Sequence, residues 1–207
     1  MKGGVIMNRS LDKKKFESVI KVVHHFLRSS VVALYVLLGL LVLVSVVFPF
    51  ISKDLFNYDL ANLNHINIEF GSILYDIRGI ITFTGIVNVK WLLSLLFVVL
   101  TVNLMFFQFI LIQLHKIITD VCNKTPFSVK NIKCLKYMGI AYLISSIVLP
   151  LVNGLLFVNI ANTFNIFDAT INFSMDFQSA FIGIIILILA YVFEYGATLQ
   201  EDIDLTV

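Results

Sequence analysis

Four long runs of apolar residues dominate the pattern of hydrophobic and polar positions along the chain. They cover residues 31–50, 91–114, 137–157 and 177–193. Each run is close to the ~20 residues that an α-helix needs to cross bilayer hydrocarbon. Strands of a membrane barrel would alternate apolar and polar residues over segments of about 10, and the first run does not alternate. We therefore expect a membrane all-α fold, a four-transmembrane-helix bundle that forms a single integral membrane domain.

The composition agrees with this interpretation. The chain is 59% hydrophobic and 14% charged, whereas soluble domains average about 25% charged residues. The polar segment before the first run is about 30 residues long, and no small-x-small cleavage site follows Phe50. We therefore expect the first run to be a retained helix rather than a signal peptide.

The segment 11–28, just before the first run, has the periodicity of an amphipathic helix. Apolar residues recur at three- to four-residue spacing and form one stripe, opposite a charged stripe. The apolar stripe consists of Phe16, Ile20, Val23 and Leu27. We expect an interfacial amphipathic helix here, after which the chain turns into the bilayer. Adjacent residues on a helix point about 100° apart. We therefore expect His24 and His25 to face solvent or headgroups rather than to share a metal ion.

Lysine and arginine are sorted to one side of the runs. Seven of the 15 precede the first run, five lie between the second and third, and only Lys53, Arg78 and Lys90 fall in the other two loops. The positive-inside rule then places both termini in the cytoplasm. The loop 115–136 and the acidic tail 194–207 would also be cytoplasmic, and the loops 51–90 and 158–176 extracytoplasmic. A basic cytoplasmic face favours the lipid bilayer, not nucleic acid, as its direct partner.

Alternating residues in both outer loops predict short strands. In the first loop Ile66, Ile68 and Phe70 alternate with polar residues, and in the second loop the same pattern covers residues 171–177. We expect a small extracytoplasmic β-containing cap that joins the two loops. Such a cap could bind a ligand or peptide, or could simply cover the outer helix ends.

The cytoplasmic loop carries a helix-start signal. Thr125 as N-cap, with Pro126 at the first helical position, predicts a helix over residues 127–136 that leads into the third run. Cys122 and Cys134 flank this signal in a reducing compartment, so neither a disulfide nor a zinc site is expected. The sequence contains no HExxH, GxSxG, P-loop or dinucleotide-binding pattern. We therefore expect no catalysis, no cofactor and no metal.

Few polar side chains interrupt the runs. We expect Asn103, Gln108 and Asn153 to form hydrogen bonds between helices, which average ~0.6 kcal/mol in membrane proteins. Glu194 lies at the cytoplasmic end of the fourth run, and it is the one carboxylate placed near hydrocarbon. No charged residue lies in the middle of a run. Proton-coupled transport normally uses such a residue, so its absence argues against active transport.

The tail after the fourth run contains acidic residues but no basic ones. It ends Leu199-Gln200-Glu201-Asp202-Ile203-Asp204-Leu205-Thr206-Val207. This LQEDxDLTV ending resembles that of the YoaS-like domain-of-unknown-function family of bacterial four-helix membrane proteins. The stretch 123–137, with its TPFS sequence and lysines, is also similar to that family. The resemblance implies no enzymatic activity, and it implies a cytoplasmic helix-turn-helix regulator as a partner.

Two hypotheses of different classes follow. In the first, the chain is a regulatory or sensor component of the bacterial cell membrane, and its tail docks the regulator through residues matching the family ending. These are Leu199, Gln200, Glu201, Asp202, Asp204 and Leu205. In the second, the chain confers immunity or a permeability function against a membrane-active peptide, and its outer loops carry the activity. A small transporter or channel subunit is a weaker alternative, and none of these excludes a homo-oligomer.

Overall fold

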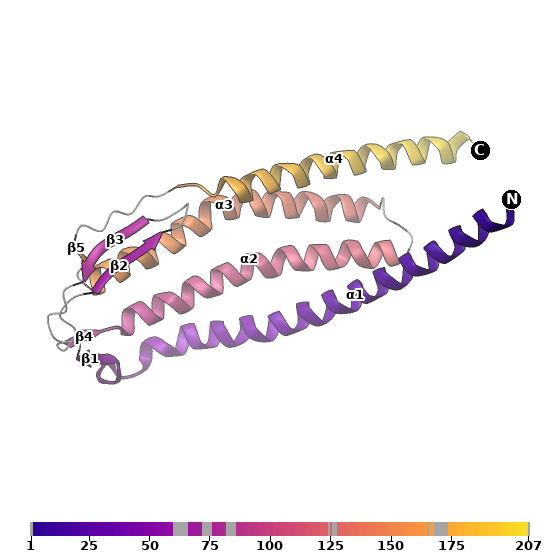
Figure 1. Ribbon diagram of the computed structural model, residues 1–207. Helices are drawn as coiled ribbons and strands as arrows, with labels where there is room; N and C mark the ends of the chain where they lie inside the picture. Colours follow the sequence, from indigo (N-terminus) through magenta and orange to yellow (C-terminus); the bar gives the residue numbers. More distant parts are fainter. Residues whose placement is uncertain are drawn as a thin grey trace. The chain divides into compact units, whose positions relative to one another are not determined.

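The computed structural model contains four long α-helices, which Figure 1 traces in chain order. They are α1 (Lys2–Val47), α2 (Lys90–Cys122), α3 (Val129–Thr163) and α4 (Phe177–Thr206). The structure describes residues 2–59, 66–71, 76–81, 86–123, 125, 128–164, 166–167 and 174–206. Within these residues the structure contains the four long helices and five strands.

Each long helix contains a segment that is long and apolar enough to cross a membrane, which confirms the prediction of four such helices. The segments are Ser18–Phe50, Lys90–Cys122, Val129–Thr163 and Phe177–Leu199. At 1.5 Å per residue, the shortest, of 23 residues, is about 35 Å long, against about 30 Å of hydrocarbon.

The first helix is longer than the sequence pattern predicts. We expected an interfacial helix over residues 11–28, a turn, and then a separate membrane helix, but α1 runs without interruption from Lys2 to Val47. The physical reason is that the chain offers no helix breaker between Gly4 and Gly39. The hydroxyl of Ser29, where the turn was expected, donates within the helix to the Phe26 carbonyl at 2.9 Å. The helix ends at Val47, and Pro49 follows within the short helix η1 (Phe48–Phe50).

The chain divides into two compact units, each described by itself. The first unit comprises Met1–Tyr35, Phe107–Ala141 and Ile182–Val207. The second unit comprises Val36–Phe106 and Tyr142–Phe181. Each unit therefore holds a segment of every long helix, and the five strands all belong to the second unit.

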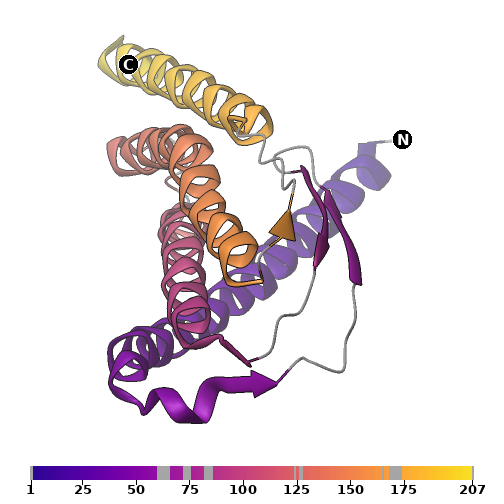
Figure 2. The same ribbon diagram turned by 90° about the vertical axis from the view of Figure 1, so that its left-hand side faces the viewer.

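Two small antiparallel sheets lie in the second unit. Strand β1 (Asn57–Asp59) pairs with β4 (Ile86–Asn88), and a three-stranded sheet has the order β2 (Ile66–Gly71), β3 (Asp76–Ile81) and β5 (Ile166–Phe167). Figure 2 shows β2 and β3 side by side, with β5 next to β3. Because β5 follows α3 while β2 and β3 precede α2, this sheet joins the two connecting loops, as the alternating pattern predicts.

The strand from the second loop lies earlier in the chain than expected. We placed it over residues 171–177, but β5 is at Ile166–Phe167 and Ser174–Asp176 are not in a strand; residues 171–173 lie outside the described part. Asp176 instead caps α4. Its carboxylate accepts hydrogen bonds from the Ser179 backbone N–H at 3.0 Å and the Ser179 hydroxyl at 2.6 Å. This N-cap ends the extended segment, because it satisfies donors that the first helical turn leaves free.

Side-chain contacts support the β1–β4 pair and the short helix η2 (Lys53–Phe56) before it. Asn88 donates to the Asn57 side chain at 2.6 Å and to the Lys53 carbonyl at 3.0 Å. The buried Lys90, at the start of α2, donates to the Ile51 carbonyl. The segment between α1 and β1 is thus bonded to the residues that precede and begin α2.

In the first unit, α3 begins at a different cap from the predicted one. The expectation that Thr125 caps the helix is wrong, because α3 begins at Val129. The hydroxyl of Ser128 accepts the Asn131 backbone N–H at 3.2 Å, which is the geometry of an N-cap. Ser128 also donates to the carboxylate of Asp120 at 3.2 Å, and Thr125 donates to the Asp120 carbonyl at 3.3 Å. The loop between α2 and α3 is therefore held to the end of α2.

Small residues bring α3 and α4 close together in the first unit. A Cβ added to Gly139 would lie 2.6 Å from Cγ of Leu187 and 3.0 Å from the carbonyl oxygen of Gly183. Ala190, two turns further along α4 than Gly183, is fully buried. Small residues at such contacts let membrane helices approach closely and gain van der Waals contact.

Candidate functional site

The acidic tail is a continuation of the fourth helix. We expected a short tail after Phe193, and α4 continues as helix through Thr206. Leu199 is 45% exposed, and Glu201 and Asp202 are also exposed. Gln200, Asp204 and Leu205 lie on the same helical backbone, and their side chains are outside the described part.

One face of this helix combines aromatic, aliphatic and acidic side chains. Tyr191, Tyr195, Leu199 and Asp202 recur at intervals of four, four and three residues, which places them on one stripe. All four are exposed, Tyr195 by 67%. We call these four residues the tail face. It offers apolar surface and negative charge on a helix, a combination that can bind a partner with apolar and basic groups.

Glu194 anchors the helix just before the tail. Nζ of Lys136 on α3 donates to both carboxylate oxygens of Glu194, at 3.0 and 2.9 Å. The same ammonium group lies 5.2 Å from the ring centre of Tyr191, within the range of a cation–π contact. The two charged side chains are 34% and 47% exposed. The ion pair neutralises the carboxylate that the sequence places nearest to hydrocarbon, and it joins α3 to α4.

The other polar residues predicted to link helices also have partners on neighbouring helices. In the second unit, Asn103 of α2 donates to the Asn153 side chain of α3 at 3.1 Å and to the Val99 carbonyl at 2.8 Å. In the first unit, Gln108 is only 3% exposed, and its amide donates to the Val31 carbonyl of α1 at 3.1 Å. Each of these hydrogen bonds gives a polar atom a partner in an otherwise apolar surrounding.

The sequence reading missed a regular series of polar residues on α2. Ser94, Thr101, Gln108 and His115 follow one another at intervals of seven residues, so they lie on one face of the helix. In the second unit Thr101 lies 3.3 Å from the Ser45 hydroxyl of α1. In the first unit Gln108 and His115 also contact α1. The seven-residue period was visible in the sequence and could have identified this face.

The structure corrects our expectation for His24 but not for His25, which is exposed as expected. His24 does not face solvent alone, because its ring stacks on that of His115, with centres 5.0 Å apart and an interplanar angle of 23°. Thr119 donates its hydroxyl hydrogen to the His115 carbonyl at 2.8 Å. Its oxygen is thus the acceptor for Nδ1–H of His24 at 3.3 Å. His25 is exposed, and its Nδ1–H donates to the Lys21 carbonyl at 2.8 Å.

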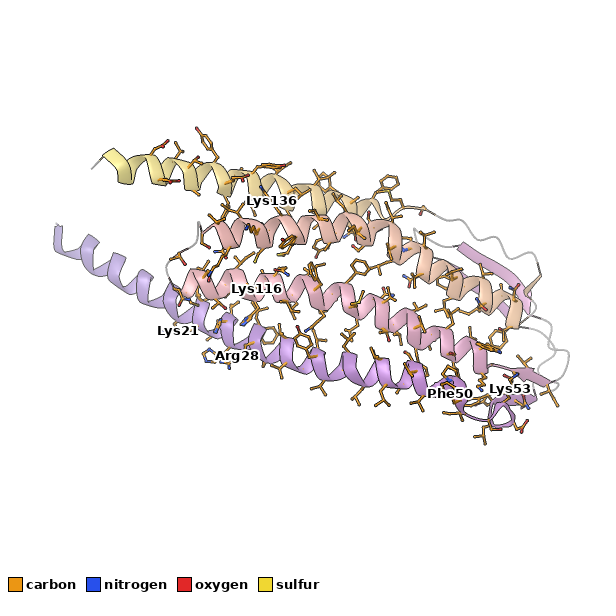
Figure 3. All side chains as sticks on the ribbon, turned by 180° about the vertical axis from the view of Figure 1, so that it is seen from behind. Lys21, Arg28, Phe50, Lys53, Lys116 and Lys136 are labelled. Atoms are coloured by element: carbon orange, nitrogen blue, oxygen red, sulfur yellow. The ribbon has the colours of Figure 1, made fainter. Side chains whose placement is uncertain are left out.

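Exposed cations are found on the same two helices as this histidine pair. Lys21 and Arg28 extend from α1, and Lys116 extends from α2 (Figure 3), where its ammonium group lies 3.5 Å from the amide oxygen of Gln113. Among the described side chains of the first unit, the one ion pair joins Lys136 to Glu194. Lys21, Arg28 and Lys116 therefore have no carboxylate partner among these side chains. Over the same residues, no group of three or more His, Cys, Asp or Glu side chains could hold a metal ion. Cys122 and Cys134 are free thiols.

Comparisons with known proteins place the chain in a family. Neither the curated proteins nor the solved structures include a match. A family model described as "Protein of unknown function (DUF2975)" matches residues 82–207. The matched region contains α2, α3 and α4, including the Lys136–Glu194 pair and the tail face. Because it covers more than half of the chain, the chain belongs to the DUF2975 family.

Proposed function

We propose that this protein is a regulatory component of the bacterial cell membrane, and that its C-terminal helix docks a cytoplasmic partner. Four helices are long and apolar enough to cross a membrane. The distribution of lysine and arginine favours an orientation with both termini in the cytoplasm. In this orientation the tail is accessible to cytoplasmic proteins. The LQEDxDLTV ending resembles that of the YoaS-like family, and this resemblance makes a helix-turn-helix regulator the first partner to test.

The observation that carries this proposal is the continuous helix from Phe177 to Thr206. A disordered tail would lose conformational entropy on binding, whereas a helix already formed avoids much of that loss. The tail face presents Tyr195 and Leu199 as apolar contacts, with Asp202 beside them. An amphipathic helix of this kind can lie in a complementary groove of a partner.

Charge adds selectivity to the proposed docking. Glu201 and Asp202 are exposed, and Asp204 follows on the same helix. Such a cluster of like charges accelerates association with a basic surface and disfavours acidic partners. The Lys136–Glu194 pair supports the arrangement, because it fixes α4 against α3 where the tail begins.

The test uses full-length protein, produced together with a helix-turn-helix regulator from the same bacterium and solubilised from membranes. We expect the Leu199→Ala variant and the Glu201→Lys, Asp202→Lys double variant each to reduce co-purification of the regulator at least fivefold, and to change transcription of its targets. Asp54→Asn is the matched control, because it removes an exposed carboxylate from the second unit. Unchanged co-purification and unchanged transcription with both tail variants would contradict the docking proposal.

A protective role against a membrane-active peptide is the second candidate. The observation in its favour is the β2–β3–β5 sheet, which joins the two loops that the proposed orientation places outside the membrane. In that case, removal of residues 66–81 should sensitise cells to the peptide, while the tail variants should remain protective. Equal sensitivity of cells with and without the gene, across a panel of such peptides, would count against this candidate.

A further inference from the structure

The first unit contains a group of cationic and imidazole side chains that the proposed docking does not use. It consists of Lys21, His24 and Arg28 on α1 and of His115 on α2; we call it the cationic cluster. We propose that the cationic cluster is a binding site for a phosphate-bearing anion, and that its ligand in the membrane is the headgroup of an anionic phospholipid.

The backbone brings these residues together on two neighbouring helices. Lys21, His24 and Arg28 recur at intervals of three and four residues, so they share one face of α1. The stacking of His24 on His115 joins that face to α2. Arg28 follows His24 by one turn of α1. The cluster thus combines residues from two helices, not one helix alone.

Each imidazole has one nitrogen left for a ligand. Nδ1 of His24 is occupied by its hydrogen bond to Thr119. Nδ1 of His115 is enclosed by protein and, in the described part of the chain, has no hydrogen-bond partner. Nε2 is therefore the ligand-binding nitrogen of both rings.

The surroundings favour an anion over a cation. Lys21 and Arg28 are exposed and, within the described residues, are not paired with a carboxylate. Asp120 lies five residues beyond His115 on α2, and its carboxylate accepts the Ser128 hydroxyl at the start of α3. Arginine and lysine are the side chains that most often bind phosphate groups, through charge-assisted hydrogen bonds.

The position of the cluster favours a lipid over free phosphate. Beyond Arg28, the same stripe of α1 continues with Val32 and Tyr35, both of which are exposed. An anionic lipid could place its phosphate at Arg28 and its acyl chains along these side chains. This step depends on the proposed membrane placement. Each Lys or Arg near a membrane surface contributes about 1 kcal/mol of attraction to anionic lipid, which is about fivefold in affinity.

Native mass spectrometry of the full-length protein in detergent would test the site. Dioctanoyl phosphatidylglycerol, dioctanoyl phosphatidylcholine and inorganic phosphate are added in turn. We expect phosphatidylglycerol to bind at least tenfold more tightly than phosphatidylcholine. The Lys21→Gln, Arg28→Gln double variant should lose that preference, with phosphatidylglycerol affinity reduced more than tenfold. The His24→Asn, His115→Asn double variant should weaken phosphatidylglycerol binding at least threefold.

Lys53→Gln is the matched control, since it removes an exposed cation of the second unit and should leave binding unchanged. Competition by inorganic phosphate, with the same dependence on Lys21 and Arg28, would support the anion site with free phosphate as its ligand. Equal affinity for both lipids without phosphate binding would overturn the proposal, as would undiminished binding by the Lys21→Gln, Arg28→Gln variant. Circular dichroism checks that each variant is folded. A variant truncated after Thr198 should keep the lipid preference, so failure of the docking proposal remains distinguishable.

Discussion

Gly139 is the residue at which the packing of the first unit is most sensitive to size. The carbonyl of Gly183 and the side chain of Leu187 already occupy the space that a Cβ would need. A backbone carbonyl cannot rotate away as a side chain can, so α3 and α4 would have to separate. Gly39 on α1 is the opposite case, because an added Cβ would meet no atom within 4 Å.

This contrast predicts unequal effects of the same substitution. Gly139→Leu should lower the free energy of unfolding by about 1–3 kcal/mol, the usual effect of overpacking. Gly39→Leu should change it by less than about 0.5 kcal/mol, as expected for a side chain without neighbours. Thermal unfolding of both variants in the same detergent would measure the difference. Equal stabilities would mean that α3 and α4 are not in close contact at Gly139.

At the scale of elements, Lys136 and Glu194 determine how the end of α4 is attached to α3. Both groups are partly exposed, and exposed ion pairs contribute about 0.2–1 kcal/mol. The contact with the ring of Tyr191 adds a further reason for Lys136 to remain in place. The pair therefore matters more for the direction of the tail helix than for overall stability.

Exchange of the two charges tests this role. Lys136→Glu alone places two carboxylates together, so it should weaken both stability and co-purification of the proposed partner. Addition of Glu194→Lys should restore most of each, because the ion pair is formed again in reverse. Lys133→Glu, at an exposed position one turn earlier on α3, is the control and should have little effect. If the double variant is no better than Lys136→Glu alone, the ion pair does not position the tail.

Particular residues show which elements the sequence could predict. The four apolar runs identified the helices because their length and composition alone meet the membrane requirement. The cap at Ser128 was missed because Thr125 and Pro126 form an equally good local start signal. In the structure Ser128 accepts the Asn131 backbone N–H, whereas Thr125 is bonded back to Asp120 at the end of α2. The length of α1 was missed because a charged stripe was taken to require a turn, although no residue there breaks a helix.

The candidate sites also differ in how much of each could be identified from the sequence. Glu194 and the tail residues could be identified from the sequence, because they are charged residues next to an apolar run. The stacking of His24 on His115 depends on which helices are neighbours, and their separation of 91 residues gives no local signal. The ion pair of Glu194 with Lys136 likewise depends on the packing of α3 against α4.

At the scale of the whole molecule, the orientation of the chain in the membrane makes the proposed function testable. With Cys122 and Cys134 replaced by serine, single cysteines can be introduced at exposed positions. A membrane-impermeant maleimide should label the Ser52→Cys variant in intact cells, and the Thr125→Cys variant only after the cells are permeabilised. This result is expected because twelve of the 15 basic residues would be cytoplasmic. The reverse labelling would place the tail outside and remove the basis for a cytoplasmic partner.

The contacts of α2 with α1 in the first unit have a mechanical consequence. Gln108 bonds to Val31 and His115 stacks on His24, so the two contact points are seven residues apart on both helices. A slide of α1 along α2 by one turn, about 5.4 Å, would break both contacts at once and leave the Gln108 amide without its acceptor. We therefore expect α1 to slide along α2 only in whole-turn steps. Smaller movements of one helix along its axis should move the other helix with it.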